Sequence, residues 1–145
     1  MKNASNKPVN ITVLDGYTLN PGDLSWAAIE QLGTTKIFDR TAPELTLKRS
    51  IDADILVVNK QVIDEAVFAA LPKLKCVCVT ATGFNNIDIK AASQRNVPVC
   101  NVTGYGSSSV AQHVFALILE LLNQVGNYNK SVKKGDWSKA FNHSY

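Results

Sequence analysis

The sequence predicts an α/β fold built on a doubly wound, five-stranded parallel sheet. Short runs rich in β-branched residues alternate along the chain with segments of helical periodicity. Two of the runs, at residues 55–58 and 76–80, are almost continuously apolar, which is typical of strands buried on both faces of a parallel sheet. A length of 145 residues suits one compact domain that folds without a disulfide or a metal.

The expected elements follow one another as strand, helix, strand throughout. We expect strands at residues 11–14, 36–38, 55–58, 76–80 and 97–102. A capping box runs from Thr41 to Glu44, with a proline in the first turn. Asp64 is the expected cap of a helix over residues 65–70, which Pro72 stops. Asn85 or Asn86 would cap a helix over residues 87–95, with Asp88 in its first turn.

The last helix, expected from Val110 to Val125, has an unusually wide apolar surface. Ser109 and Gln112 form a second capping box, and Gly126 is the expected C-terminal stop. Two apolar stripes lie side by side on it: Val110, Val114, Leu117, Leu121 and Val125, and then Ala111, Phe115, Ile118 and Leu122. Because one core contact does not require so much apolar surface, either a second copy of the chain or the tail at residues 127–145 should cover it. We expect a homodimer or other self-association through this helix.

Composition excludes several classes of protein. Fifteen basic and twelve acidic residues give a net charge of +3 without a basic stripe, so nucleic acid is not an expected partner. Residues 1–8 contain no apolar signal-peptide core, and the apolar stretch at residues 110–122 is too short and too polar to span a membrane. We therefore expect a cytoplasmic protein.

Cys76, Cys78 and Cys100 form no C-x-x-C motif. The first two should point to the same face of a strand, and we expect all three to be small buried residues in a reducing compartment. No metal site is expected, because no further cysteine or histidine lies close by in the sequence.

The strongest candidate for a binding site is the loop after the fourth strand, at residues 81–85. Ligands of open parallel sheets bind beyond the carboxyl ends of the strands. Gly83 lets the backbone turn closely, and free N–H groups ahead of a helix at Ile87 would face a carboxylate or phosphate. The alternative is an ordinary glycine turn with an asparagine cap. Lys60, at the end of the third strand, either steers an anionic substrate or is a solvated lysine.

A second glycine-rich segment is a weaker candidate. Gly104 and Gly106 lie between a strand and a helix, as in a dinucleotide fingerprint, but Ser109 occupies the sixth position and no acid closes a following strand. We interpret this segment as a joint between a strand and a linking helix. His113 has no orienting partner in the sequence, and His143 lies in the tail, so neither is expected to be catalytic.

Four segments together resemble the D-isomer-specific 2-hydroxyacid dehydrogenases. They are DRTAPE at 39–44, NK at 59–60, ATGFNNID at 81–88 and NVTGYGSSSVAQHVFALIL at 101–119. The resemblance covers residues 11–145 and is strongest to the glycerate dehydrogenase, or hydroxypyruvate reductase, subgroup. The G-x-W at Gly135 to Trp137 also resembles the motif that precedes the nucleotide-binding segment of this family.

This resemblance implies a flavodoxin-like substrate domain over residues 1–106, followed by a linking helix and tail over residues 107–145. It implies that Thr82, Gly83 and Phe84 offer backbone N–H groups to a substrate carboxylate. It also places Thr82 and Val110 near the nicotinamide ring of the cofactor. The implied partner is a small 2-hydroxy or 2-keto acid, first of all glycerate or hydroxypyruvate, and the implied cofactor is NAD or NADP.

The remaining motifs of the family have no counterpart in these 145 residues. They are the G-x-G-x-x-G, the ribose-binding acid, the substrate arginine and the Glu–His acid–base pair. Hydride transfer requires a positioned cofactor and a general acid. We therefore expect no catalytic residue in this chain, no cofactor bound to it alone, and no activity without a nucleotide-binding domain.

Two other functions remain open at this point. The same scaffold serves as a non-catalytic, corepressor-type module in the wider family, and a Glu–His pair beyond residue 145 would argue against that role. A phosphoacceptor receiver domain has the same order of elements, but it needs an acidic pair after the first strand and an aspartate after the third. Here Asp15 stands alone, and Asn59 and Lys60 follow the third strand.

Overall fold

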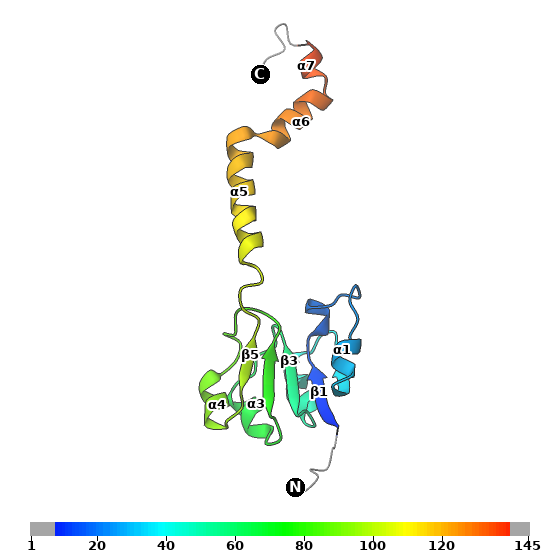
Figure 1. Cartoon of the computed structure of the whole chain (residues 1–145), viewed down its shortest axis with the longest axis vertical. Helices are drawn as coiled ribbons and strands as arrows, with labels where there is room; N and C mark the ends of the chain where they lie inside the picture. Colours follow the sequence, from blue (N-terminus) through cyan, green and yellow to red (C-terminus); the bar gives the residue numbers. More distant parts are fainter. Residues whose placement is uncertain (1–7, 140–145) are drawn as a thin grey trace. The chain divides into compact units, whose positions relative to one another are not determined.

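The computed structural model describes residues 8–139. The chain divides into two units, Met1–Thr103 and Gly104–Tyr145, which are described separately. The first unit contains five parallel strands in the order β2-β1-β3-β4-β5 (Figure 1). They are β1 (Val9–Val13), β2 (Gly33–Ile37), β3 (Ile55–Val58), β4 (Cys76–Val79) and β5 (Val99–Asn101). The predicted fold class is confirmed.

Short helices connect the strands of the first unit. They are η1 (Gly16–Thr18), α1 (Ala27–Glu30), η2 (Pro43–Leu45), α2 (Thr46–Ser50), α3 (Glu65–Ala70) and α4 (Ile89–Gln94). The strand β5 is shorter than the predicted 97–102 at both ends. At its start the cause is local, because the Val97 N–H donates to the Ala92 carbonyl of α4 and Pro98 has no N–H to donate.

The two faces of the sheet have separate apolar clusters. The larger one joins buried residues of β3 and β4 to α3 and α4, and Phe68 at its centre is only 1% exposed. Burial of such a side chain contributes roughly 1.5–3 kcal/mol. On the opposite face, Ile11, Val13 and Val57 pack against Trp26 and Ile29. The strand β3 is thus buried on both faces, as predicted.

The strand β4 departs from that prediction. Val77 and Val79 are buried on one face, whereas Cys76 and Cys78 are only partly buried on the other, and Cys100 on β5 is exposed. The expectation of three buried cysteines is therefore wrong for Cys100. The expectation that Cys76 and Cys78 share a face is confirmed, since their Sγ atoms lie 3.8 Å apart.

Of the predicted helix starts in the first unit, one is confirmed and two are corrected. The Asp64 carboxylate accepts the Val67 N–H at 2.9 Å and caps α3. Asp88, rather than Asn85 or Asn86, caps α4 by accepting the Ala91 N–H at 2.9 Å. Thr41 caps no helix, because its hydroxyl donates to the carbonyl of Leu14.

The second unit is helical where it is described. It contains α5 (Ser107–Asn123), α6 (Val125–Lys133) and α7 (Asp136–Lys139). The helix expected from Val110 to Val125 thus begins three residues earlier, after Gly106, and ends where Gln124 adopts a left-handed conformation. Ser109 lies within α5 and Gly126 within α6, so neither has its predicted role.

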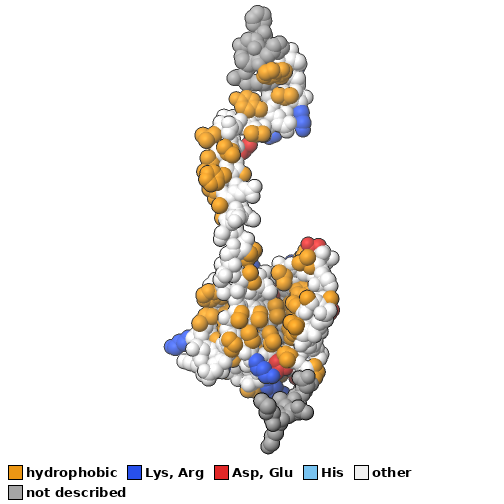
Figure 2. All heavy atoms as spheres, in the orientation of Figure 1, with side chains coloured by type: hydrophobic (Ala, Val, Ile, Leu, Met, Phe, Trp, Pro, Cys, Tyr) orange, Lys and Arg blue, Asp and Glu red, His pale blue; other side chains and the backbone are white. Residues whose placement is uncertain are grey.

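All seventeen residues of α5 escape burial, and hydrophobic side chains gather along this helix in Figure 2. Ile118 is 44% and Leu122 is 74% exposed. Over residues 8–139, no helix combines the length and the apolar character that crossing a bilayer requires.

Candidate functional site

The candidate site is a hollow at the carboxyl edge of the sheet. All five strands run parallel, so the loops after β3 and β4, which are neighbours, meet at this edge. Between them lies a cavity of about 260 Å³. It is lined by Asn59, Lys60, Ala81, Gly83, Asn85 and Asn86. The structure therefore brings together Lys60 and Gly83, two residues that the sequence predicted separately.

The backbone after β4 offers unused hydrogen-bond donors. Within residues 8–139, no protein group accepts a hydrogen bond from the N–H of Thr82, Gly83 or Phe84. These three residues are exposed, and a Cβ built on Gly83 would meet only Asn85 Oδ1, at 3.6 Å. Three consecutive free N–H groups are suited to an external anion.

The geometry of this loop differs from the prediction in two respects. The φ of Gly83 lies outside the left-handed region, so the turn itself does not require glycine. The helix α4 begins at Ile89 instead of Ile87, because residues 86–88 pair with Ile63: the Ile63 N–H donates to the Asn86 carbonyl, and the Asp88 N–H donates to the Ile63 carbonyl. The free N–H groups are thus separated from the helix terminus, and its dipole is not their main source of positive potential.

Thr82 is fixed by the neighbouring strand. Its hydroxyl donates to the Val102 carbonyl at 2.9 Å, and Asn101 Nδ2 donates to the Thr82 carbonyl at 2.8 Å. These two hydrogen bonds tie the loop to the end of β5 and leave the Thr82 N–H as its free donor. The Thr82 hydroxyl is consequently already engaged in this structure.

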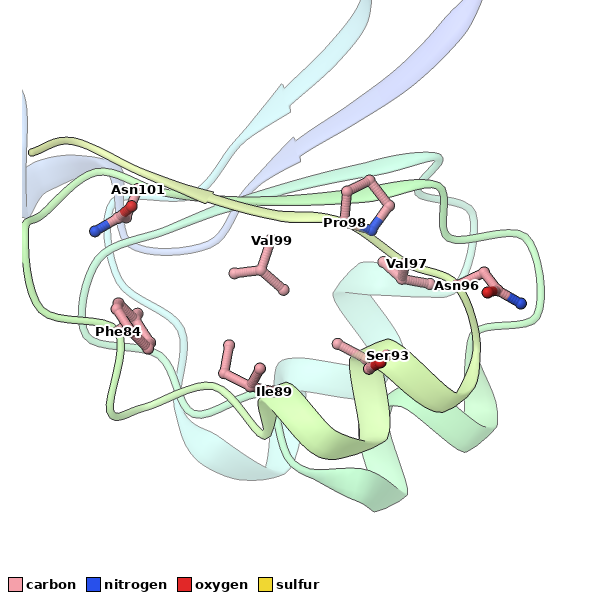
Figure 3. A pocket seen from close by; sticks show the side chains of 9 residues that line it. Phe84, Ile89, Ser93, Asn96, Val97, Pro98, Val99 and Asn101 are labelled. Carbon is pink, nitrogen blue, oxygen red and sulfur yellow. The ribbon is translucent and has the colours of Figure 1, made fainter.

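The Phe84 side chain lies away from the hollow. It lines a larger groove of about 630 Å³ between α4 and β5, where it faces Ile89 and Val99 (Figure 3). The ring is 48% exposed. Of the three residues with free N–H groups, Gly83 lines the hollow, whereas Thr82 and Phe84 are not among its lining residues.

Sequence reasoning missed the role of Asp15, which is only 6% exposed. Its carboxylate accepts the backbone N–H groups of Asn59, at 2.8 Å, of Gln61, at 3.0 Å, and of Lys60 between them. Asn86 Nδ2 donates to the carbonyl oxygens of Asn59 and Gln61, at 3.3 and 2.7 Å. Together, Asp15 and Asn86 hold the loop that carries Lys60. The position of Asp15, directly after the first expected strand, is the feature of the sequence that could have indicated a role at the carboxyl edge of the sheet.

The electrostatics of the hollow favour an anion. The described ion pairs, Lys36 with Asp52 and Lys75 with Asp54, leave Lys60 unpaired within residues 8–139. Lys60 also borders a second hollow, of about 450 Å³, between α2 and α3. Lys60 and Gly83 both line the hollow, so a cation and one free N–H are available there as donors to a small carboxylate.

Val110, the other expected cofactor residue, lies in the first turns of α5 in the second unit and is 65% exposed. Among residues 8–139, no group of three or more His, Cys, Asp or Glu side chains is arranged to hold a metal ion. The Asp15 carboxylate, which a receiver domain would use for a cation, is here engaged by three N–H groups.

Comparison with known proteins identifies the family. The model of the D-isomer specific 2-hydroxyacid dehydrogenase catalytic domain matches residues 13–138. The chain belongs to this family. It is similar to a hydroxypyruvate reductase of Blautia hydrogenotrophica, with 42% identity over 132 residues that cover 89% of this chain and 41% of that protein. It is also similar to a glycerate dehydrogenase of Methylorubrum extorquens, with 34% identity over 68% of this chain and 31% of that protein.

A solved structure has the same fold over most of this chain. An acyclic imino acid reductase, Bsp5, in complex with NADPH and D-Arg, superposes with a TM-score of 0.72 at 25% identity. The match covers 88% of this chain and 41% of that structure. The chain thus spans less than half the length of the relatives that it matches.

Proposed function

We propose that this chain provides the substrate-binding part of an NAD- or NADP-dependent oxidoreductase. The reaction interconverts a small D-2-hydroxy acid and its 2-keto acid, first of all glycerate and hydroxypyruvate. The hollow at the carboxyl edge of the sheet carries the proposal, because it is lined by Gly83, whose N–H is free, and by Lys60, which has no described ion pair. The similarity to a hydroxypyruvate reductase, at 42% identity, supports this choice of substrate.

In the proposed complex, the N–H groups of Thr82, Gly83 and Phe84 bind the substrate carboxylate. Lys60 contributes long-range attraction at the opposite wall of the hollow. Asp15 and Asn86 position the loop of Lys60 through the hydrogen bonds described above. When bound, the nicotinamide supplies or accepts the hydride.

We further propose that residues 1–106 form the substrate domain and residues 107–145 the linking helix and tail. From the resemblance to the family, Thr82 and Val110 are the residues that would contact the nicotinamide ring. Both histidines of the sequence, His113 and His143, lie in the second unit, so the first unit offers no imidazole as a general acid. Because the nucleotide-binding motifs and the Glu–His pair of the family have no counterpart in these 145 residues, we expect them alone to bind a carboxylate without turning it over. We expect this protein to act in the cytoplasm.

An NMR titration of the ¹⁵N-labelled 145-residue chain with hydroxypyruvate tests the proposal. We expect saturable shifts of the Thr82, Gly83 and Phe84 amide signals. Glycerol, which lacks the carboxylate, is the matched control ligand and should leave these signals in place. Saturable shifts confined to Ile89, Ser93 and Val97 in the groove between α4 and β5, or no shifts at all, would contradict the proposal.

The second candidate function is a non-catalytic binding module on the same scaffold. It would need the same hollow for a regulatory acid, and the titration does not separate it from the enzyme. A turnover assay of a protein that joins this segment to a nucleotide-binding domain does. Oxidation of NADH in the presence of hydroxypyruvate supports the enzyme, and binding without turnover supports the module.

A further inference from the structure

Three thiols converge on the partly open face of β4 and β5. Cys76 and Cys78 alternate with the buried Val77 and share one face of β4, with their Sγ atoms 3.8 Å apart. In the parallel register of β4 and β5, Cys78 and Cys100 are Cα partners, so Cys100 faces the same side. The sequence alone did not predict this convergence, because 21 residues lie between Cys78 and Cys100.

The pair Cys78 and Cys100 has the better geometry for a covalent bond. Neighbouring strands are about 4.8 Å apart, whereas positions two residues apart on one strand are separated by about 6.6 Å. Disulfides join Cα atoms roughly 4.4–6.8 Å apart, most often near 5.5–6 Å. A bond between Cys78 and Cys100 fits that range with room to adjust, whereas a bond between Cys76 and Cys78 would lie at its upper limit.

The surroundings assign different roles to the three thiols. Cys100 is exposed and accessible to a small oxidant, whereas Cys78 is partly covered by the smaller apolar cluster. Burial, followed by the neighbouring thiols of Cys78 and Cys100, raises the pKa of Cys76 to about 12. The strand register, which pairs Cys100 with Cys78, selects Cys78 as the partner of Cys100.

We propose that Cys78 and Cys100 form a reversible redox site, which a peroxide closes to a disulfide across β4 and β5. This site is separate from the carboxylate hollow and does not depend on the proposed function.

The chemistry balances with one peroxide for each pair of thiols. The Cys100 thiolate attacks a peroxide oxygen, the O–O bond breaks, and hydroxide leaves and takes up a proton, so that Cys100 becomes a sulfenic acid. Cys78 gives up its proton and attacks the Cys100 sulfur, the S–S bond forms, the S–O bond breaks, and the leaving hydroxide takes up that proton as the second water. Two thiols lose two electrons and two protons, and one H₂O₂ becomes two H₂O.

The test is a thiol count on the reduced 145-residue chain treated with equimolar hydrogen peroxide. Of the three thiols in the sequence, we expect two to be lost and to return with dithiothreitol. Mass spectrometry of proteolytic peptides, digested without reduction, should show Cys78 linked to Cys100 within one chain. A Cys76–Cys78 bond, a disulfide between two chains, or sulfinic acid at Cys100 with Cys78 still reduced would each overturn the proposal.

Two serine variants complete the test. Cys100 is exposed, so its replacement by serine should leave the fold intact. The Cys100→Ser variant should form no intramolecular disulfide. Cys76→Ser is the matched control from the same cluster and should retain it, with the loss of two thiols under the same treatment. An intramolecular disulfide that persists in Cys100→Ser, or one that disappears in folded Cys76→Ser, would assign the site to another pair and refute the inference.

Discussion

Replacement of Gly83 by valine should weaken ligand binding at the candidate site without lowering the stability of the fold. A Cβ at this position meets only Asn85 Oδ1, at 3.6 Å, and the φ of Gly83 lies outside the left-handed region. The free energy of unfolding should therefore change by no more than about 0.5 kcal/mol, as for other surface substitutions. The valine methyl groups would, however, stand beside the free N–H groups of Thr82, Gly83 and Phe84.

The expected effect on binding follows from the hydrogen bonds that the valine prevents. A hydrogen bond to a charged group contributes about 1.5–3 kcal/mol, and each 1.4 kcal/mol is a tenfold change in affinity. The loss of one such bond should weaken hydroxypyruvate binding about 10- to 150-fold. The NMR titration described above measures the dissociation constant, and urea unfolding measures stability.

Gly106→Val provides the matched control for Gly83→Val. Gly106 also has no left-handed φ, and a Cβ there meets nothing within 4 Å, but it lies in the second unit ahead of α5. This control should bind hydroxypyruvate like the unmodified chain. A folded Gly83→Val variant whose dissociation constant stays within about threefold, less than 1 kcal/mol, would refute the carboxylate role of this loop.

Three further predictions concern the same molecule. Asp15→Asn should lower the free energy of unfolding by about 1–3 kcal/mol, measured in urea, because a buried acceptor of three N–H groups is impaired. Since the pKa of Cys76 rises from 9.0 to about 12 on folding, the unfolded chain loses this proton first and stability should fall as pH rises from 9 towards 12. Cys76→Ala should make the free energy of unfolding in urea less dependent on pH between 9 and 12. The same pH dependence in this variant would contradict the assignment to Cys76. Ile118→Glu with Leu122→Lys should reduce concentration-dependent self-association in light scattering coupled to gel filtration, and a monomeric unmodified chain would contradict it.

Local sequence signals predicted the helix ends only in part: the cap of α3 is confirmed, whereas the capping boxes at Thr41 and Ser109 and the stop at Gly126 are not. Asp64 caps α3 because its signal, an aspartate before an apolar helical run, involves only nearby residues. The cap of α4 was misplaced because Asn85, Asn86 and Asp88 are all capping residues within four positions. The choice among them depends on a distant partner, Ile63, which holds residues 86–88 in an extended pairing.

The sequence predicted individual residues of the candidate site, but it did not predict which of them lie together. Lys60 and Gly83 each followed from their position after a strand, whereas their shared hollow depends on the adjacency of β3 and β4. The role of Asp15 likewise requires β1 to lie beside β3, although Asn59 lies 44 positions further along the chain. Periodicity along the chain reports which residues form strands, but it does not report the order of those strands in the sheet.

That strand order also explains why an anion should select one loop over the other. The N–H groups of Asn59, Lys60 and Gln61 would themselves suit an anion, but the Asp15 carboxylate, reaching over from β1, already occupies them. On the neighbouring loop, no described group occupies those of Thr82, Gly83 and Phe84. An internal carboxylate thus occupies the donors of the loop that carries Lys60, and the neighbouring loop is the one that we propose for an external carboxylate.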